Sequence, residues 1–314
     1  MSYVIINNLL KRYGELCAVD NLSFTVEKGE IFGLLGPNGA GKSTTLSVLT
    51  TLIDFDKGEI SIDGMDIKKD KMKIKQMIGM VPQDIALYDH LSALENVKFF
   101  ASLYGMKGKE LTDLSKEALE FVGLSNKHSI KPKQMSGGMR RRLNIACGIA
   151  HAPKLIILDE PTVGVDTQSR EHILNSIKVL RDRGATVIYT SHYMQEVDEI
   201  CDRIAIIDKG QMVASGTKTE LVSLVTDLQS VFIETRIPNS FDMEEYKKKQ
   251  RLMPGVKAVS IEDNIIRIDV SADQDNITKI IEQFVVLGLP IVNIHSEVPN
   301  LDTLFLTLTG HELR

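Results

Sequence analysis

Short apolar runs alternate with segments of helical period from about Val4 to Val225. The runs predict strands and the segments between them predict helices, a combination typical of an α/β fold with a largely parallel central sheet. The predicted strands of this sheet are Ile31–Leu35, Ile78–Val81, Leu155–Leu158, Val187–Thr190 and Ile204–Asp208.

Two parts of this region depart from the α/β pattern. Three early runs predict antiparallel strands joined by tight turns: Val4–Ile6, Leu22–Val26 and Glu59–Gly64. Residues 91–135 carry helical periodicity without a convincing strand. This stretch therefore predicts a helical insertion in the α/β unit.

The pattern changes after Val225, so we expect a first domain over residues 1–225 and a smaller one over 226–314. The second domain follows the ferredoxin-like α+β order of strand, helix, strand, strand, helix, strand. Its predicted elements are Val231–Ile237, Asp242–Leu252, Val256–Ile261, Ile265–Val270, Asp273–Leu287 and Pro290–Ser296, with a final short helix over Leu301–Leu308. No catalytic constellation occurs there, which favours binding, dimerisation or regulation.

Composition limits the class of protein. The 314 residues give room for about two domains, and 43% of them are hydrophobic, which supplies an ordinary core. The net charge of −5 favours no polyanionic partner, so nucleic acid is not expected. Three cysteines without metal-site spacing predict free thiols in a reducing compartment. We find no signal segment and no apolar run of about 18 residues, so any membrane crossing is expected in another chain.

A glycine-rich stretch lies between a predicted strand and a predicted helix. It matches the phosphate-loop spacing G-x-x-x-x-G-K-[ST] with Gly36, Pro37, Asn38, Gly39, Ala40, Gly41, Lys42, Ser43 and Thr44. The glycines let several N–H groups and the helix dipole face one anion. Lys42 would reach the β- and γ-phosphates, and the Ser43 hydroxyl would ligate Mg²⁺. A glycine turn with a chance lysine is the alternative, which the fixed spacing disfavours.

The strand Leu155–Leu158 ends in two carboxylates, Asp159 and Glu160. Open α/β sheets bind ligands at the carboxyl edge, beside the phosphate loop. Asp159 would hold Mg²⁺ directly or through water, and Glu160 would polarise the water that attacks the γ-phosphate. The alternative is a carboxylate pair that caps the turn at Pro161.

Together with these motifs, Tyr13, Gln83, Ser136-Gly137-Gly138, Asp166 and His192 make the chain resemble the ATP-binding subunits of ABC transporters over the whole first domain. The resemblance implies a P-loop NTPase fold with a mixed sheet core, an antiparallel β subdomain and a helical insertion. It also implies that Tyr13 stacks on adenine, that Gln83 contacts Mg²⁺ and the attacking water, and that His192 contacts the γ-phosphate. Asp166 belongs to the same nucleotide-binding set. Singly, each of these residues has an ordinary structural interpretation.

Ser136, Gly137 and Gly138 correspond to the signature stretch of that family and open a helix rich in arginine. A helix start preceded by glycines is a second anion site. Because the chain already has a complete phosphate loop, the second site predicts a head-to-tail dimer in which Ser136 and Gly138 face the γ-phosphate of the other subunit. A glycine turn before an exposed basic helix is the alternative. Met139 stands where the family usually has glutamine, and residues 163–166 read Val-Gly-Val-Asp in place of Ser-Gly-Leu-Asp.

Residues 137–143 and 191–197 are similar to ATPases that serve ABC-2 type exporters of drugs, antibiotics and lipids. The tail, residues 299–310, resembles the closing motif of the daunorubicin-resistance type. The resemblance implies an ATPase that powers a separate polytopic permease from the cytoplasmic face of the membrane. A homodimer and a dimer with a similar ATPase are both open. Binding of a small effector is the alternative role of the C-terminal domain.

The mechanical link to the permease is expected to run from Gln83 through residues 84–96 into the helical insertion, with Leu87–His90 as the contact surface. A soluble ABC-type ATPase that acts on ribosomes or DNA is the alternative function. Such proteins usually carry two cassettes or long coiled coils, and this chain has one cassette and a short insertion. The cargo would touch the permease, so its identity is not encoded here.

Overall fold

The computed structural model describes residues 2–191, 193–224, 229–238, 243–251, 253–262, 264–271, 276–297, 301 and 304–305. The chain divides into two compact units, Met1–Thr217 and Lys218–Gly310. We describe each unit by itself.

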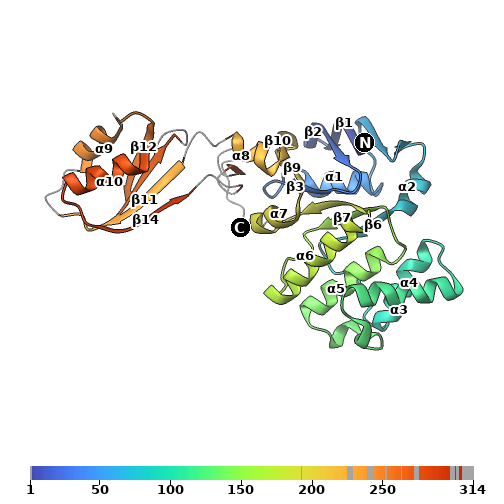
Figure 1. The fold of residues 1–314 in the computed structure, drawn as a ribbon. Helices are drawn as coiled ribbons and strands as arrows, with labels where there is room; N and C mark the ends of the chain where they lie inside the picture. The colour runs from blue at the N-terminus through green and yellow to red at the C-terminus, as the bar shows by residue number, and fades with distance from the viewer. Residues whose placement is uncertain are drawn as a thin grey trace. The chain divides into compact units, whose positions relative to one another are not determined.

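A six-stranded sheet forms the centre of the first unit, in the order β10-β9-β3-β8-β7-β6 (Figure 1). Its strands are β3 (Ile31–Leu35), β6 (Ile78–Val81), β7 (Leu155–Asp159), β8 (Thr186–Thr190), β9 (Arg203–Asp208) and β10 (Gln211–Thr217). All neighbouring pairs are parallel except β9 and β10. The strands β3, β7 and β8 are buried along their whole length, as their apolar runs require. The predicted mixed sheet core is confirmed.

An antiparallel sheet with the order β2-β1-β4-β5 covers the same core. Its strands are β1 (Ser2–Tyr13), β2 (Leu16–Glu27), β4 (Lys57–Ile62) and β5 (Met65–Asp66). The strand predicted at Val4–Ile6 continues to Tyr13 in the structure. The sequence pattern ends early because irregularities after Ile6 and a left-handed Asn8 (φ 51°) interrupt the alternation of apolar and polar positions. Helix α1 (Lys42–Leu49) contributes Leu46, Val48 and Leu49 to the shared core.

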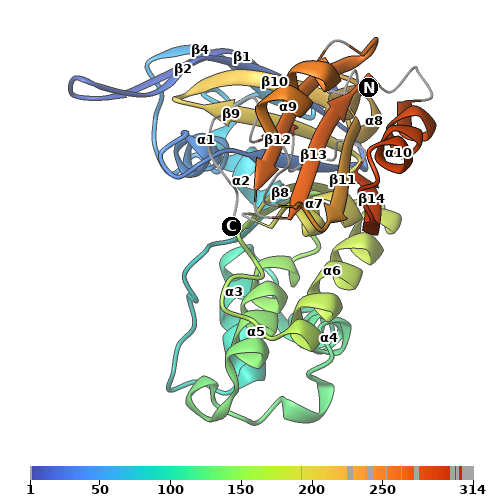
Figure 2. The same cartoon turned by 90° about the vertical axis from the view of Figure 1, so that its left-hand side faces the viewer.

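The helices between residues 93 and 182 lie together on one side of the central sheet (Figures 1 and 2). The predicted insertion is present as α3 (Ala93–Leu103), α4 (Gly108–Phe121) and two short 3₁₀ turns, and α3 begins with a capping box of Ser92 and Glu95. The other helices are α2 (Lys71–Met77), α5 (Gly137–Ile149), α6 (Thr167–Asp182) and α7 (Met194–Ile200). Helices α3, α4 and α5 pack on one another.

The second unit begins with α8 (Lys218–Ser223) and contains an antiparallel sheet in the order β12-β13-β11-β14. Its strands are β11 (Gln229–Thr235), β12 (Val256–Glu262), β13 (Ile265–Val270) and β14 (Ile291–Glu297). Helices α9 (Met243–Arg251) and α10 (Asn276–Val286) cover the face whose alternate residues are buried. This arrangement confirms the ferredoxin-like prediction. Residues 302–303 and 306–308 of the predicted final helix lie outside the described residues, and the domain boundary at 225 stays a prediction.

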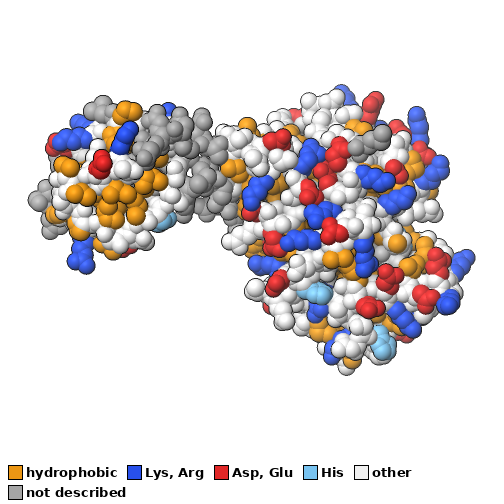
Figure 3. Space-filling view, in the orientation of Figure 1, with side chains coloured by type: hydrophobic (Ala, Val, Ile, Leu, Met, Phe, Trp, Pro, Cys, Tyr) orange, Lys and Arg blue, Asp and Glu red, His pale blue; other side chains and the backbone are white. Residues whose placement is uncertain are grey.

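The surface of the first unit mixes acidic and basic side chains on the face that Figure 3 shows. This mixture agrees with a net charge of only −5. Within the described ranges, no helix is both long enough and apolar enough to span a bilayer. Cys17, Cys147 and Cys201 are free thiols.

Candidate functional site

The predicted nucleotide-binding segments converge on the carboxyl edge of the central sheet. The phosphate loop follows β3, Gln83 lies two residues beyond β6, and Asp159 is the last residue of β7. Ser191 follows β8 directly, whereas His192 lies outside the described residues. Because β3, β6, β7 and β8 run parallel, these segments emerge on the same side of the sheet.

The phosphate loop needs glycine where other backbone segments approach it. A Cβ atom on Gly36 would lie 2.3 Å from the carbonyl oxygen of Ile207, and one on Gly41 would lie 2.6 Å from that of Ala18. Gly41 also has a left-handed φ of 101°. Helix α1 begins after Gly41 with no side-chain cap and no acidic residue in its first turn. Its N–H groups and the positive end of its dipole are therefore suited to an anion.

Lys42 is buried inside this loop. Its Nζ atom donates to the carbonyl oxygens of Gly36 (2.7 Å) and Pro37 (3.1 Å). Burial lowers the pKa of Lys42, and the nearby carboxylates of Glu160 and Asp159 act in the opposite direction. Ser43 is exposed at the start of α1, so its hydroxyl is open to a ligand. Ala40 is buried, Pro37 and Thr44 are partly buried, and Asn38 and Gly39 are exposed.

The backbone turns at the end of β7, where the two carboxylates lie. We call this segment the carboxylate turn (residues 159–162). Thr190 ties its first two residues together: its hydroxyl donates to Asp159 Oδ1 (2.7 Å) and accepts from the Glu160 N–H (3.0 Å). Glu160 has a left-handed φ of 48°, which is uncommon for a residue with a side chain. Gln83 Nε2 donates to Glu160 Oε2 at 2.7 Å, so two predicted site residues from different strands meet here.

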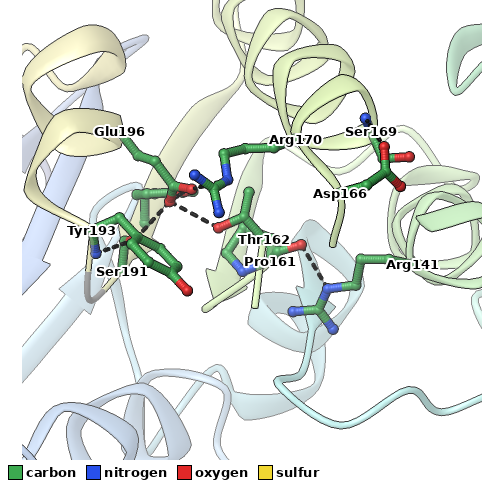
Figure 4. A network of polar contacts seen from close by, with 10 residues as sticks. Arg141, Pro161, Thr162, Asp166, Ser169, Arg170, Ser191, Tyr193 and Glu196 are labelled. Atoms are coloured by element: carbon green, nitrogen blue, oxygen red, sulfur yellow. Dashed lines mark hydrogen bonds and ion pairs between the residues drawn. The ribbon is translucent and has the colours of Figure 1, made fainter. Parts of the chain in front are cut away.

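Arg141 holds the backbone around the carboxylate turn. It is the fifth residue of α5 with a residue exposure of 2%, so all its donors need partners inside the protein. Its five N–H donors bond five carbonyl oxygens, those of Pro161 (2.7 Å), Pro82 (2.7 Å), Gln83 (2.9 Å), Asp159 (3.1 Å) and Glu160 (2.6 Å). Figure 4 shows the bond to Pro161. Burial lowers the pKa of Arg141, but a guanidinium remains protonated in proteins.

Glu196 supports the other side of the carboxylate turn. This buried carboxylate lies at the start of α7 and accepts from the hydroxyls of Thr162 (2.8 Å), Tyr189 (2.7 Å) and Ser191 (2.6 Å). Arg170 Nε lies 3.3 Å from its second oxygen as an ion pair. Figure 4 shows the side chains around Glu196, which come from several elements. The network ties residue 162 to residue 191, the last described position before His192.

The sequence did not indicate functional importance for Arg141 or Glu196. Arg141 appeared only as one of three consecutive arginines on a helix. A signal was present in the helical period, because Ile145 and Ile149 are buried on α5 and Arg141 lies four residues before the first of them. A charged residue on a buried helix face needs an internal partner.

The signature stretch caps α5. The Ser136 hydroxyl accepts from the Met139 N–H (3.2 Å), and Ser136 itself is exposed. Gly137 is the first helical residue. A Cβ atom on Gly138 would lie 2.2 Å from Ser169 Oγ, so α5 approaches the start of α6 closely. There the Asp166 carboxylate caps α6 by accepting from the Ser169 N–H (2.9 Å). Among the described residues, the hydrogen bonds of Ser136 stay within α5 and none joins it to the phosphate loop.

Tyr13 ends β1 with 49% of its surface exposed, and Lys11 Nζ lies 5.2 Å from its ring centroid. An exposed ring face of this kind can stack on a planar base. The possible Mg²⁺ ligands Ser43, Gln83 and Asp159 all offer oxygen, which this hard cation prefers. Gln83 uses its amide nitrogen toward Glu160, which leaves its amide oxygen as an acceptor. In the ranges that the structure describes, no cluster of three His, Cys, Asp or Glu side chains suits a metal.

Comparison with known proteins agrees with this geometry. Residues 19–163 match the family model described as ABC transporter. The chain is 44% identical over 309 residues to the linearmycin resistance ATP-binding protein of Bacillus subtilis, covering 98% of both chains. It is 31% identical to a daunorubicin resistance ATP-binding protein of Streptomyces coeruleorubidus, covering 99% of this chain and 97% of the relative.

Solved structures give the same result for the first unit. The dimeric structure of a bacterial ABC transporter cassette superposes with a TM-score of 0.63 at 30% identity, covering 68% of this chain and 98% of that one. The same coverage and TM-score apply to a dimeric cassette in a post-hydrolysis state, bound to ADP and inorganic phosphate. The resemblance drawn from the sequence motifs is confirmed.

Proposed function

The chain belongs to the ATP-binding proteins of ABC transporters and is an ATPase of the drug and antibiotic exporter type, and from this premise we propose that it dimerises around two ATP molecules to power a separate ABC-2 type permease. The permease would export a drug, antibiotic, lipid or similar compound. The chain would lie on the cytoplasmic face of the membrane, attached through that partner.

In this proposal the phosphate loop binds ATP through its backbone. The backbone N–H groups of residues 36–44, Pro37 excepted, would surround the β- and γ-phosphates. Lys42 would exchange its two carbonyl partners for phosphate oxygens. Tyr13 stacks on the adenine ring. Ser43, Gln83 and Asp159 would hold Mg²⁺, which neutralises charge on the phosphates when it is bound.

Glu160 is the proposed general base. It takes a proton from water while the water oxygen bonds to the γ-phosphorus and the bond to the β,γ-bridging oxygen breaks, releasing ADP and inorganic phosphate. Gln83 supports this role because its bond to Glu160 aims the carboxylate at one position. His192 would donate to the γ-phosphate, and its neighbour Ser191 is fixed by Glu196.

The second nucleotide contact comes from a partner chain. Ser136 and Gly138, with Gly137 between them, would face the γ-phosphate that the other subunit holds, and Asp166 would lie beside the same interface. The exposure of Ser136 at the start of α5 supports this assignment. A homodimer and a dimer with a similar ATPase use the same contacts.

The permease would dock on the loop that follows Gln83. This loop exposes Ile85 (40%) and Tyr88 (49%), and the Tyr88 ring packs edge-on against Phe99 with centroids 4.7 Å apart. Exposed apolar side chains on an otherwise polar surface suit a protein partner. The observation that carries the proposal is the Gln83–Glu160 hydrogen bond, because it joins this loop to the catalytic base.

A pull-down from detergent-solubilised native membranes tests the proposal. We expect a polytopic membrane protein to copurify with the wild type and recovery to fall with Tyr88→Ala. Leu52→Ala is the matched control, because Leu52 is also exposed (69%) but lies outside the loop, and its recovery should equal the wild type. Recovery of ribosomes or nucleoid proteins without a membrane partner would instead support the soluble ATPase alternative and overturn the transport proposal.

A further inference from the structure

Arg141 joins two segments that serve the same chemistry. Through its side chain, α5 contacts the start of the Gln83 loop and the carboxylate turn at once. The two segments contribute five carbonyl oxygens, and these dipoles converge on one point. Converging carbonyls repel one another unless a cation lies between them, so the guanidinium fixes the distance between Gln83 and Glu160.

No other type of amino-acid side chain at position 141 could make an equivalent set of bonds. A guanidinium presents five N–H donors in a fixed plane, and Arg141 uses every one of them. Lysine keeps the charge but has three donors at most, so at least two carbonyls would lose their partners. Glutamine loses the charge as well.

The same helix begins at the signature stretch. Ser136 is the N-cap of α5, and Arg141 follows five residues later, about 7.5 Å along the helix axis. An α-helix of 13 residues transmits a small rotation or shift along its length as a rigid body. A displacement of Ser136 therefore moves the carbonyls that Arg141 holds.

We propose that Arg141 is a positioning residue that transmits the presence of ATP at Ser136 to Gln83 and Glu160 of the same chain. The ATP that contacts Ser136 belongs to the partner's phosphate loop, so each nucleotide would organise the hydrolytic residues of the opposite site. This inference rests on the proposed dimer. According to this inference, the Arg141 side chain couples the two ATP sites of the dimer.

The test compares ATP hydrolysis by the wild type, Arg141→Gln and Arg141→Lys as a function of ATP concentration. A misplaced base costs roughly 10²-fold in rate for a displacement near 1 Å, so we expect kcat to fall about 10²-fold in Arg141→Gln and about 10-fold in Arg141→Lys. KM for ATP should stay within about threefold, because Arg141 does not touch the phosphate loop. The Hill coefficient should fall from above one to one.

Arg140→Gln is the matched control, because it removes the same charge from an exposed position on the same helix. Its kcat and Hill coefficient should equal those of the wild type. Thermal unfolding and ATP-binding stoichiometry identify the folded fraction of each variant, and Arg141→Lys keeps the test usable if Arg141→Gln does not fold. In a Glu160→Gln background, Arg141→Gln should lower the residual rate by clearly less than the factor of about 10² expected with Glu160 present, since part of its effect acts through Glu160.

Three outcomes would overturn the inference. One is an unchanged Hill coefficient in both Arg141 variants, and another is a higher KM at constant kcat. The third is an equal loss in Arg140→Gln. Failure of the dimer is recognised separately: a wild type with a Hill coefficient of one and no ATP-dependent dimer by light scattering refutes the proposed function, and this inference falls with it. A cooperative wild type with unaffected Arg141 variants refutes this inference alone.

Discussion

The phosphate loop and the carboxylate turn lie at the same edge of the sheet, but different forces hold them. The loop is shaped by its own backbone, with glycine at 36 and 41 because neighbouring carbonyls leave no space for a Cβ atom. The turn is held by side chains from three distant elements, namely Arg141 of α5, Thr190 of β8 and Glu196 of α7. The shape of the phosphate loop therefore depends on local geometry, whereas the position of Glu160, the proposed base, depends on tertiary packing.

The two variants with the largest expected effects change different quantities: one in the carboxylate turn changes ATP turnover, and one in the phosphate loop changes ATP affinity. Glu160→Gln should lower turnover by about 10²- to 10⁴-fold while ATP affinity changes little, because the amide can still accept from Gln83 but cannot take a proton. Lys42→Ala should weaken ATP binding by about 10- to 100-fold through loss of a charge-assisted contact. Equilibrium binding of a fluorescent ATP analogue and phosphate release give the two quantities. Equal effects of both variants on affinity would contradict the division.

Glu196→Gln tests the turn through folding stability. Removing the charge leaves three hydroxyls and Arg170 around a neutral amide, so we expect unfolding free energy to fall by about 3 kcal/mol. Glu199→Gln is the control on the same helix, since its ion pair with Lys178 (2.7 Å) is at the surface and should contribute less than about 1 kcal/mol. Urea denaturation of both proteins measures the difference. A stable Glu196→Gln protein would show that the hydroxyl network does not hold the turn.

The smallest expected effect comes from valine substitutions at the two ends of β8. Thr190 and Thr186 are both buried, and each hydroxyl accepts from a backbone N–H, that of Glu160 and that of Gly29 respectively. Valine at either position should cost about 1–2 kcal/mol of stability. Only Thr190→Val should also slow hydrolysis, by about 10-fold, because its hydroxyl orients Asp159 and Glu160. Equal kcat values for the two variants would count against side-chain control of the turn.

The same contrast explains what the sequence could reveal. Strands such as β7 and β8 were predictable because unbroken apolar runs are buried on both faces. The phosphate loop was predictable because its function is encoded in nine consecutive residues. Arg141 lies 20 residues from Pro161 in the chain, and Glu196 lies 34 residues from Thr162, so no local pattern connects them.

Other elements were hidden for physical reasons as well. Strand β1 was underestimated because its bulges break the alternation on which strand prediction depends. The Gln83–Glu160 bond joins residues 77 positions apart, and only the parallel pairing of β6 and β7 brings them together. The roles assigned to all the site residues stay predictions: those of the phosphate loop, Gln83, Asp159 and Glu160 as well as those of Tyr13, Ser136, Asp166 and His192.

The backbone of Glu160 has a consequence for how this protein can change over time. A left-handed φ of 48° costs a residue with a side chain about 1 kcal/mol or more, and glycine or asparagine would adopt it with less strain. Selection for thermal stability alone would favour replacement of this glutamate. If Glu160 is the proposed base, the protein accepts a slightly less stable fold in exchange for activity. Variants selected for heat resistance are then expected to replace Glu160 and to lose ATPase activity as a result.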